Sequence, residues 1–208
     1  NSLSGMVVPS RPMMEVLRRY GVTTRAEVIP TGLEPESFAR GDRAVFRSKY
    51  GIAQERPVLL FVGRVAHEKN IGFLLHVVGR VRREIPEALL LVAGEGPARD
   101  GLEHEAAKLG LAENVMFIGY LDRHTELNNC YRSADIFVFS SKTETQGLVL
   151  LEAMAQGVPL VAIAEMGTRD VLREGCGVRI AEERVEDFSA KVIALLKDGA
   201  ARARLGEA

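Results

Sequence analysis

Short apolar segments alternate with longer amphipathic segments along most of the chain, and this alternation constrains the fold more than any other feature. The apolar segments predict strands at residues 58–62, 89–93, 115–118, 136–139, 160–163 and 178–180. The amphipathic segments predict helices near residues 71–84, 99–109, 124–133, 148–155, 168–173 and 185–196. Strands that are apolar at nearly every position are typical of a parallel sheet covered by helices on both faces. Right-handed crossovers then favour an α/β fold with a doubly wound, Rossmann-like parallel sheet.

The expected strand order locates a crevice for a ligand. When the strand at residues 58–62 is counted first, the Rossmann-like order 3-2-1-4-5-6 makes the first and fourth strands neighbours. Ligands bind such sheets at the carboxyl ends of the strands where the order reverses. The first strand runs into the polar loop 63–70 and the fourth into the polar loop 140–147. We therefore predict that these two loops, which are distant in sequence, line one crevice.

The two loops together carry groups that suit a diphosphate. Arg64 and Lys69 supply two cations from the first loop. In the second loop, Gly147 leads into a helix-forming run that begins at Leu148, and the free N–H groups at such a helix start attract anions. A charge-assisted hydrogen bond contributes about 1.5–3 kcal/mol, so each cation is expected to matter. Gly63 would let the backbone approach the ligand closely.

Two glutamates flank this anion site. Glu144 precedes the predicted helix, and Glu152 lies inside its apolar run, where a charge is costly unless it is paired or faces a cleft. Hydrogen-bond acceptors on both sides of an anion site suit a ligand that carries phosphate and hydroxyl groups. Glu152 could instead be a structural carboxylate that caps a neighbouring loop. The turn Gly119-Tyr120-Leu121, after the third strand, could line a base pocket or be an ordinary turn.

Composition and missing motifs exclude several classes of function. The net charge is −1 with mixed signs, so no broad nucleic-acid-binding surface is expected. No G-x-G-x-x-G follows the first strand and no P-loop motif occurs, which argues against a nicotinamide enzyme and a P-loop NTPase. No spacing of His, Asp and Glu suggests a metal site, and no cofactor is expected. Cys130 and Cys176 have no metal or redox spacing, which favours reduced thiols in a cytoplasmic protein.

The first part of the chain departs from the alternating pattern. Residues 12–20 predict a helix, residues 26–29 predict a strand, and residues 41–49 lead into the main sheet. This first part of the chain is expected to be a linker and an edge extension of the sheet rather than a domain. The chain begins at Asn1 rather than at a methionine, and Ala208 ends helix-like sequence without a capping signal. We therefore expect a fragment of a longer polypeptide.

Taken together, the motifs resemble the nucleotide-sugar-binding half of retaining glycosyltransferases of the group 1 type (family 4), which have the GT-B fold. The resemblance covers most of the chain and rests on Gly63-Arg64-x4-Lys69-Asn70 and Ser141-x2-Glu144-x-x-Gly147-Leu148-x3-Glu152-Ala153-x2-Ala155-x-Gly157-x-Pro159-x-Val161-Ala162. It implies that residues 1–35 are the end of an N-terminal domain and an interdomain connection. Residues 36–208 would be the C-terminal donor-binding domain, with the first domain and the terminal helix missing.

The resemblance also implies a role for each matching residue. Arg64 and Lys69 would neutralise the donor diphosphate, and Glu144 would contact the transferred sugar and steady charge at its anomeric carbon. These three are therefore the predicted catalytic residues. The N–H groups of Gly147 and Leu148 would hold phosphate.

Glu152 would bind the ribose hydroxyls, and the remaining predicted donor-site residues are Gly63, Gly119, Tyr120 and Leu121.

The implied reaction transfers a hexose from a UDP- or GDP-sugar to a lipid or saccharide hydroxyl, with retention and without a required metal. The sequences Glu144-Thr-Gln-Gly and Gly167-Thr168-Arg169-Asp170 are similar to those of bacterial lipid glucosyltransferases that act on diacylglycerol. This similarity implies carbohydrate or glycolipid biosynthesis, with a peripheral contact at the inner face of the membrane. Because the acceptor would bind through the missing domain, we expect donor binding but little transfer. A GT-B-like sugar-nucleotide epimerase, a phosphorylase and a non-catalytic nucleotide-sugar-binding subunit stay open as alternatives.

Overall fold

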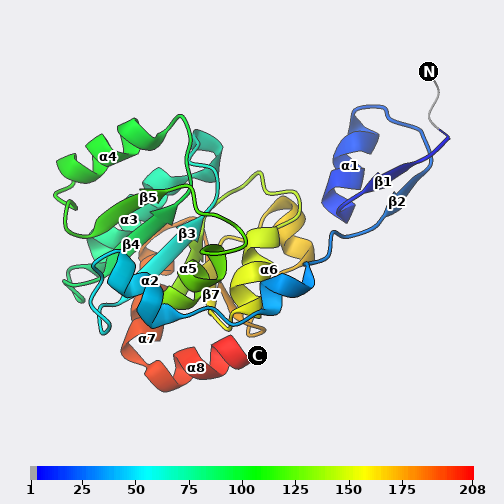
Figure 1. The fold of residues 1–208 in the computed structure, drawn as a ribbon. Coiled ribbons are helices and arrows are strands. Elements are labelled where there is room, and N and C mark those ends of the chain that lie inside the picture. The colour runs from blue at the N-terminus through cyan, green and yellow to red at the C-terminus, as the bar shows by residue number, and fades with distance from the viewer. Residues whose placement is uncertain (1–3) are drawn as a thin grey trace.

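A six-stranded parallel sheet forms the centre of the computed structural model, which describes residues 4–208 apart from the side chain of Asp170 (Figure 1). Its order is β5-β4-β3-β6-β7-β8, and every neighbouring pair is parallel. The strands are β3 (Val58–Val62), β4 (Leu89–Ala93), β5 (Val115–Gly119), β6 (Ile136–Phe139), β7 (Leu160–Ala162) and β8 (Val178–Ile180). The predicted Rossmann-like class and the order 3-2-1-4-5-6 are confirmed.

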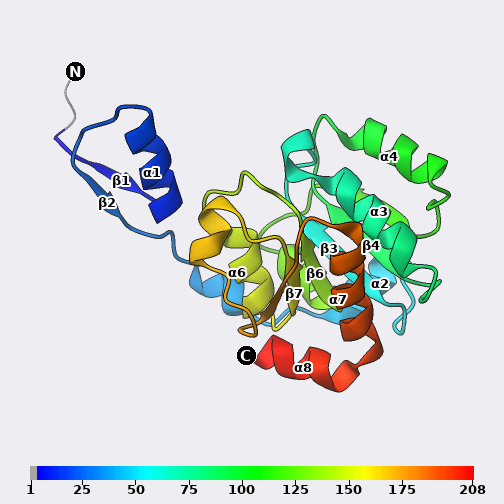
Figure 2. The ribbon, with the colours of Figure 1, turned by 180° about the vertical axis from the view of Figure 1, so that it is seen from behind.

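Helices cover both faces of the sheet, and alternate strand residues enter two separate cores. Leu59 and Phe61 of β3 belong to the first core, while Val58 and Leu60 belong to the second. The first core is completed by helices α3 (Ile71–Val81), α4 (Arg99–Lys108) and α7 (Val185–Lys197). In Figure 2, α3 and α7 lie in front of the sheet. The second core is completed by α2 (Arg43–Lys49), α5 (Leu127–Ser133) and α6 (Leu148–Ala155).

The prediction of a plain linker at residues 41–49 is wrong, because this segment contains helix α2. The carboxylate of Asp42 caps the helix by accepting a hydrogen bond from the N–H of Val45 at 3.0 Å. Phe46 packs into the second core, and the Arg47 side chain is 0% exposed. Arg47 pairs with Asp135 at 3.1 Å and donates to four main-chain carbonyls, those of Ala53, Gln54, Arg56 and Ser133.

Other helix limits differ slightly from the predictions. Helix α3 ends at Val81 rather than at residue 84, and α5 begins at Leu127 rather than at residue 124. The predicted helix at residues 168–173 is a 3-10 turn, η3 (Met166–Asp170). The last helix, α8 (Gly199–Glu207), packs against α7. No helix within residues 4–208 combines the length and the apolar character needed to cross a bilayer.

A small β-α-β unit stands apart from the main sheet (Figures 1 and 2). Strands β1 (Met6–Val8) and β2 (Ala26–Val28) pair in parallel, with helix α1 (Arg11–Arg19) between them in the chain. Residues 29–34 then lead to the 3-10 turn η1 (Pro35–Phe38) and to the main domain. Helix α1 contacts η3, so the unit faces the carboxyl end of the main sheet.

Candidate functional site

The loops that follow β3 and β6 meet at the carboxyl end of the sheet, as the strand order predicts. The hydroxyl of Ser140 donates to the carbonyls of Lys69 at 3.1 Å and Asn70 at 3.0 Å. The ammonium group of Lys69 lies 3.0 Å from Oε2 of Glu144, and each of these two side chains is 19% exposed. The two loops are therefore held together by side chains as well as by the pairing of their strands.

The carboxylate of Glu144 lies at the N-terminus of helix α6. Its Oε1 accepts hydrogen bonds from the N–H groups of Gly147 at 3.3 Å and Gln146 at 3.4 Å. Burial raises the pKa of Glu144, but the hydrogen bond and charge of Lys69 and the two N–H donors outweigh it, so the pKa is lowered. The side chain is thus an ionised carboxylate between a cation and the positive end of a helix.

The start of helix α6 depends on glycine. Gly147 is the residue before the helix and has a φ of 70°, a left-handed conformation that side chains disfavour. A Cβ at this position would also lie 3.2 Å from Cδ1 of Leu150. Leu148 begins the helix, and its N–H is one of the first-turn donors that have no carbonyl within the helix. Both predicted phosphate-binding N–H groups therefore lie at one helix end beside Lys69.

Glu152 is paired inside the protein. The residue is 3% exposed, and its Oε2 accepts a hydrogen bond from the hydroxyl of Tyr131 at 2.7 Å. Its Oε1 accepts a hydrogen bond from the guanidinium group of Arg123. Burial, and then the nearby carboxylate, raise the pKa of Tyr131, so its hydroxyl remains a donor. No motif marks Tyr131 or Arg123 in the sequence, although a charged residue in an apolar helix requires partners of this kind.

A cavity of about 370 Å³ opens at the carboxyl ends of β3, β4 and β5, and four predicted site residues line it. These are Gly63, Arg64, Tyr120 and Leu121. The Arg64 side chain is 67% exposed and lies 3.9 Å from Glu68, so it is available at the rim of the cavity. Gly119 precedes the lining residues and has a φ of 75°.

This cavity also requires glycine at residue 94, which the sequence indicates only weakly. Gly94 lines the cavity, and a Cβ on it would lie 1.9 Å from the carbonyl oxygen of Gly63. The two strand ends can therefore approach closely only when residue 94 has no side chain. The signal in the sequence is the short pattern Gly94-x-Gly96 directly after β4.

Arg123 lies between this cavity and a second, smaller one. The second cavity has a volume of about 210 Å³, and Arg123, Glu152 and Glu36 are among the residues that line it. Arg123 and Leu127 line both cavities, which are therefore adjacent. Within residues 4–208, no group of three or more His, Cys, Asp or Glu side chains is arranged to hold a metal ion.

Comparison with known proteins places this geometry in context. The family model described as glycosyl transferases group 1 matches residues 42–208. The alpha-monoglucosyldiacylglycerol synthase of Streptococcus pneumoniae is 35% identical over 167 residues, which are 78% of this chain and 38% of that protein. The D-inositol 3-phosphate glycosyltransferase of Geodermatophilus obscurus is 35% identical over 194 residues, which are 88% of this chain and 43% of that protein.

The fold is also similar to that of a solved structure. S. aureus TarM, in complex with UDP and other ligands, superimposes with a TM-score of 0.83 at 20% sequence identity. The match covers 99% of this chain and 39% of TarM. This chain therefore spans less than half the length of the curated relatives and of the solved structure that it matches.

Proposed function

Because the chain belongs to the group 1 glycosyltransferase family, we propose that it binds the nucleoside diphosphate sugar that donates a hexose. The observation that carries the proposal is the cluster at the start of helix α6. There Lys69, Glu144 and the first N–H groups of the helix meet beside the cavity that Arg64 lines. A cation pair and a helix N-terminus suit a diphosphate, and the carboxylate suits sugar hydroxyls. A UDP-sugar is favoured over a GDP-sugar because TarM, a protein of similar fold, holds UDP.

The donor would lie across three neighbouring parts of the site. The base would enter the cavity of about 370 Å³, against Gly119, Tyr120 and Leu121. The diphosphate would lie between Arg64, Lys69 and the N–H groups of Gly147 and Leu148. Glu144 would exchange its helix contacts for hydroxyls of the transferred hexose, which leaves the helix end to phosphate.

The ribose would lie against Glu152, beside Arg123, where the two cavities adjoin. Tyr131 holds one oxygen of Glu152, Arg123 contacts the other, and Glu152 lines the smaller cavity. Ribose hydroxyls would share or replace the contact that Arg123 makes with Glu152. Glu152 would then have a structural and a ligand-binding function, because the buried hydrogen bond from Tyr131 orients its carboxylate for the ribose.

For the reaction, we propose transfer with retention at the anomeric carbon and without a metal ion. Arg64 and Lys69 would stabilise the charge that develops on the leaving diphosphate, and Glu144 would stabilise charge on the sugar. The acceptor would be a lipid or saccharide hydroxyl. The relative from Streptococcus pneumoniae is named for a glycolipid product, which supports a glycolipid role. We propose that the protein acts in the cytoplasm at the inner membrane face.

We further propose that residues 36–208 are the donor-binding domain, and that residues 1–35 are the end of an acceptor-side domain and its connection. A sugar-nucleotide epimerase and a non-catalytic binding subunit are the competing functions. In the protein that carries this chain, transfer of radiolabelled hexose to an added acceptor would exclude both. Epimerised donor without transfer would favour the first, and donor binding without either reaction would favour the second.

Donor binding itself can be tested on the chain by thermal shift with UDP, GDP and their sugars. We expect UDP to raise the melting temperature, and the double variant Arg64→Ala with Lys69→Ala to lose this rise relative to its own baseline. The matched control combines Arg204→Ala and Lys108→Ala, which remove the same two charge types from the exposed faces of α8 and α4. An unchanged rise in the Arg64 and Lys69 variant would refute the diphosphate assignment.

A further inference from the structure

A third cavity, of about 530 Å³, lies between the β-α-β unit and the turn η3. Its polar lining includes Ser10, Arg11, Thr31, Gln146, Arg169 and Arg173. Three arginines line it, and no acidic side chain is among its described lining residues. We propose that this cavity binds the phosphate group of a phosphate-ester acceptor, an inference that rests on the proposed function and deepens it.

Two of the arginines have their charge available for an anion. Arg169 and Arg173 are exposed, and no described carboxylate pairs with either of them. The Nε of Arg169 donates to the carbonyl of Ala164 at 3.3 Å, which orients the guanidinium group while its two terminal nitrogens remain for a ligand. Planar guanidinium groups of this kind bind phosphate oxygens in pairs.

Some other surface arginines already have a carboxylate partner. Arg179 lies 3.1 Å from Glu174, and Arg99 lies 2.8 Å from Glu103. A phosphate that binds a paired arginine must first displace the carboxylate, which offsets a small part of the free energy of binding at an exposed ion pair. The cavity between the β-α-β unit and η3 therefore gathers three arginines where no described lining residue is a carboxylate.

The cavity adjoins the predicted donor site. Gln146, which lines it, is the neighbour in sequence of Gly147, and adjacent Cα atoms lie about 3.8 Å apart. The side-chain amide of Gln146 donates a hydrogen bond to the hydroxyl of Thr31 at 2.7 Å. This bond joins the loop 140–147 to the segment that follows the β-α-β unit. An acceptor phosphate held here would keep its ester close to the transferred sugar.

The turn η3, which carries Arg169, packs closely against the loop 140–147 that leads into helix α6. The N–H of Gly167 donates to the carbonyl of Glu144 at 3.0 Å. A Cβ on Gly167 would lie 2.1 Å from the carbonyl oxygen of Thr145, so the close approach requires glycine. Because the two loops are packed backbone to backbone, Arg169 has a defined position relative to Glu144.

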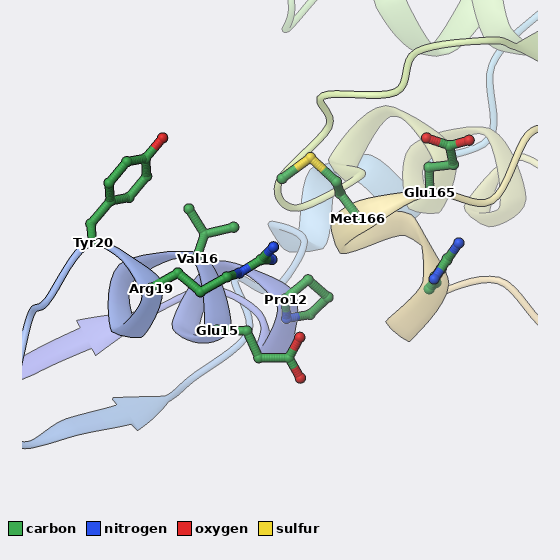
Figure 3. Close-up of a pocket in the computed structure, with 8 residues that line it drawn as sticks. Pro12, Glu15, Val16, Arg19, Tyr20, Glu165 and Met166 are labelled. Carbon is green, nitrogen blue, oxygen red and sulfur yellow. The ribbon is translucent and has the colours of Figure 1, made fainter.

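A neighbouring groove has a different character and would accommodate the rest of the acceptor. In Figure 3, Pro12 and Val16 of α1 and Tyr20 just after it face Met166 across this groove, whose volume is about 610 Å³. Glu15 and Glu165 line it together with Arg19 and Arg169, so its charges balance and it lacks the net positive charge of the arginine cavity. Arg169 lines both spaces, which are therefore adjacent.

The test titrates inorganic phosphate, and then glycerol 3-phosphate, into the ¹⁵N-labelled chain while the arginine Nε–Hε resonances are recorded by NMR. The signals of Arg169 and Arg173 should shift with one common dissociation constant. In the double variant Arg169→Gln with Arg173→Gln, the binding measured by calorimetry should weaken by more than about tenfold. The matched control Arg204→Gln, on the exposed face of α8, should bind as the parent does.

Two further measurements separate the possible outcomes. Thermal shift with UDP on the same variants tests the donor site alone, because Arg169 and Arg173 do not belong to it. A UDP shift without any response of the two arginines overturns the acceptor-phosphate inference, whereas arginine responses without a UDP shift overturn the proposed function. Flotation with phosphatidylglycerol–phosphatidylcholine vesicles against pure phosphatidylcholine identifies a lipid headgroup as the source if binding needs both arginines. Response to glycerol 3-phosphate alone identifies a soluble phosphate ester.

Discussion

Replacing Tyr131 with Phe removes a single oxygen atom from the second core, and the structure allows the cost to be worked out. The hydroxyl of Tyr131 donates to Glu152 at 2.7 Å, and both residues are buried. A hydrogen bond to a charged group contributes about 1.5–3 kcal/mol, while the retained ring keeps the cavity term small. We expect the free energy of unfolding to fall by about 2 kcal/mol, which lowers the melting temperature of a chain of this length by about 4–8 °C.

Urea unfolding followed by circular dichroism measures this loss, and a double-mutant cycle assigns it. In a Glu152→Gln background the hydrogen bond has no charged partner, so Tyr131→Phe should cost only about 1 kcal/mol. Tyr20→Phe is the matched control, because Tyr20 is 82% exposed and should change stability by less than about 0.5 kcal/mol. A Tyr131→Phe variant as stable as the parent would contradict this role of the hydroxyl. An equal loss of unfolding free energy with Glu152 and with Gln at that position would contradict the charged hydrogen bond.

Three further predictions concern the candidate donor site. The pKa of Glu144 is lowered by folding, so its ionised form stabilises the protein above the unfolded-state pKa of about 4.3, and this contribution disappears as the pH falls through the lower folded-state pKa. The difference in unfolding free energy between the parent and Glu144→Gln should therefore be constant from pH 7 to 5 and decrease as the pH falls below about 4.3, and a difference that does not change with pH contradicts the assignment. Gly94→Ala should cost about 2–3 kcal/mol, because its Cβ would lie 1.9 Å from the Gly63 carbonyl, whereas Gly79→Ala in helix α3, with nothing within 4 Å, should cost nothing in the same urea experiment. Glu152→Ala should weaken binding of UDP more than of its 2′-deoxy analogue in calorimetry, and equal losses would remove the ribose role.

The sheet could be predicted from the sequence because its strands carry a strong and local signal. Strands β3, β4 and β6 have the limits that their apolar runs predict, since residues buried on both faces leave no polar interruption. Strand β8 also has its predicted limits, although its central residue, Arg179, is exposed. The strand order followed from the handedness of crossovers, and it brought the loops after β3 and β6 together before any distance was known. Lys69 and Glu144 form their ion pair because these two loops meet.

The partners within the site could not be predicted, because they come from other elements and no motif marks them. Tyr131 reaches Glu152 from helix α5, and Arg123 reaches it from the loop before α5. Helix α2 was missed for a related reason, since its short span shows too little periodicity. Its key residue, Arg47, is a fully buried arginine, which composition rules place at the surface.

The hydrogen bonds of Arg47 also limit how far this chain can be shortened from its N-terminus. Asp135 accepts hydrogen bonds from both Arg47 and the N–H of Val58, so the first strand of the main sheet is joined to helix α2 through one carboxylate. A trimmed chain that started at β3 would bury Asp135 without this arginine and leave the carbonyl of Ser133 without the guanidinium donor. Trimming for crystallisation or NMR must therefore stop upstream of Asp42, even though the sheet itself begins only at Val58.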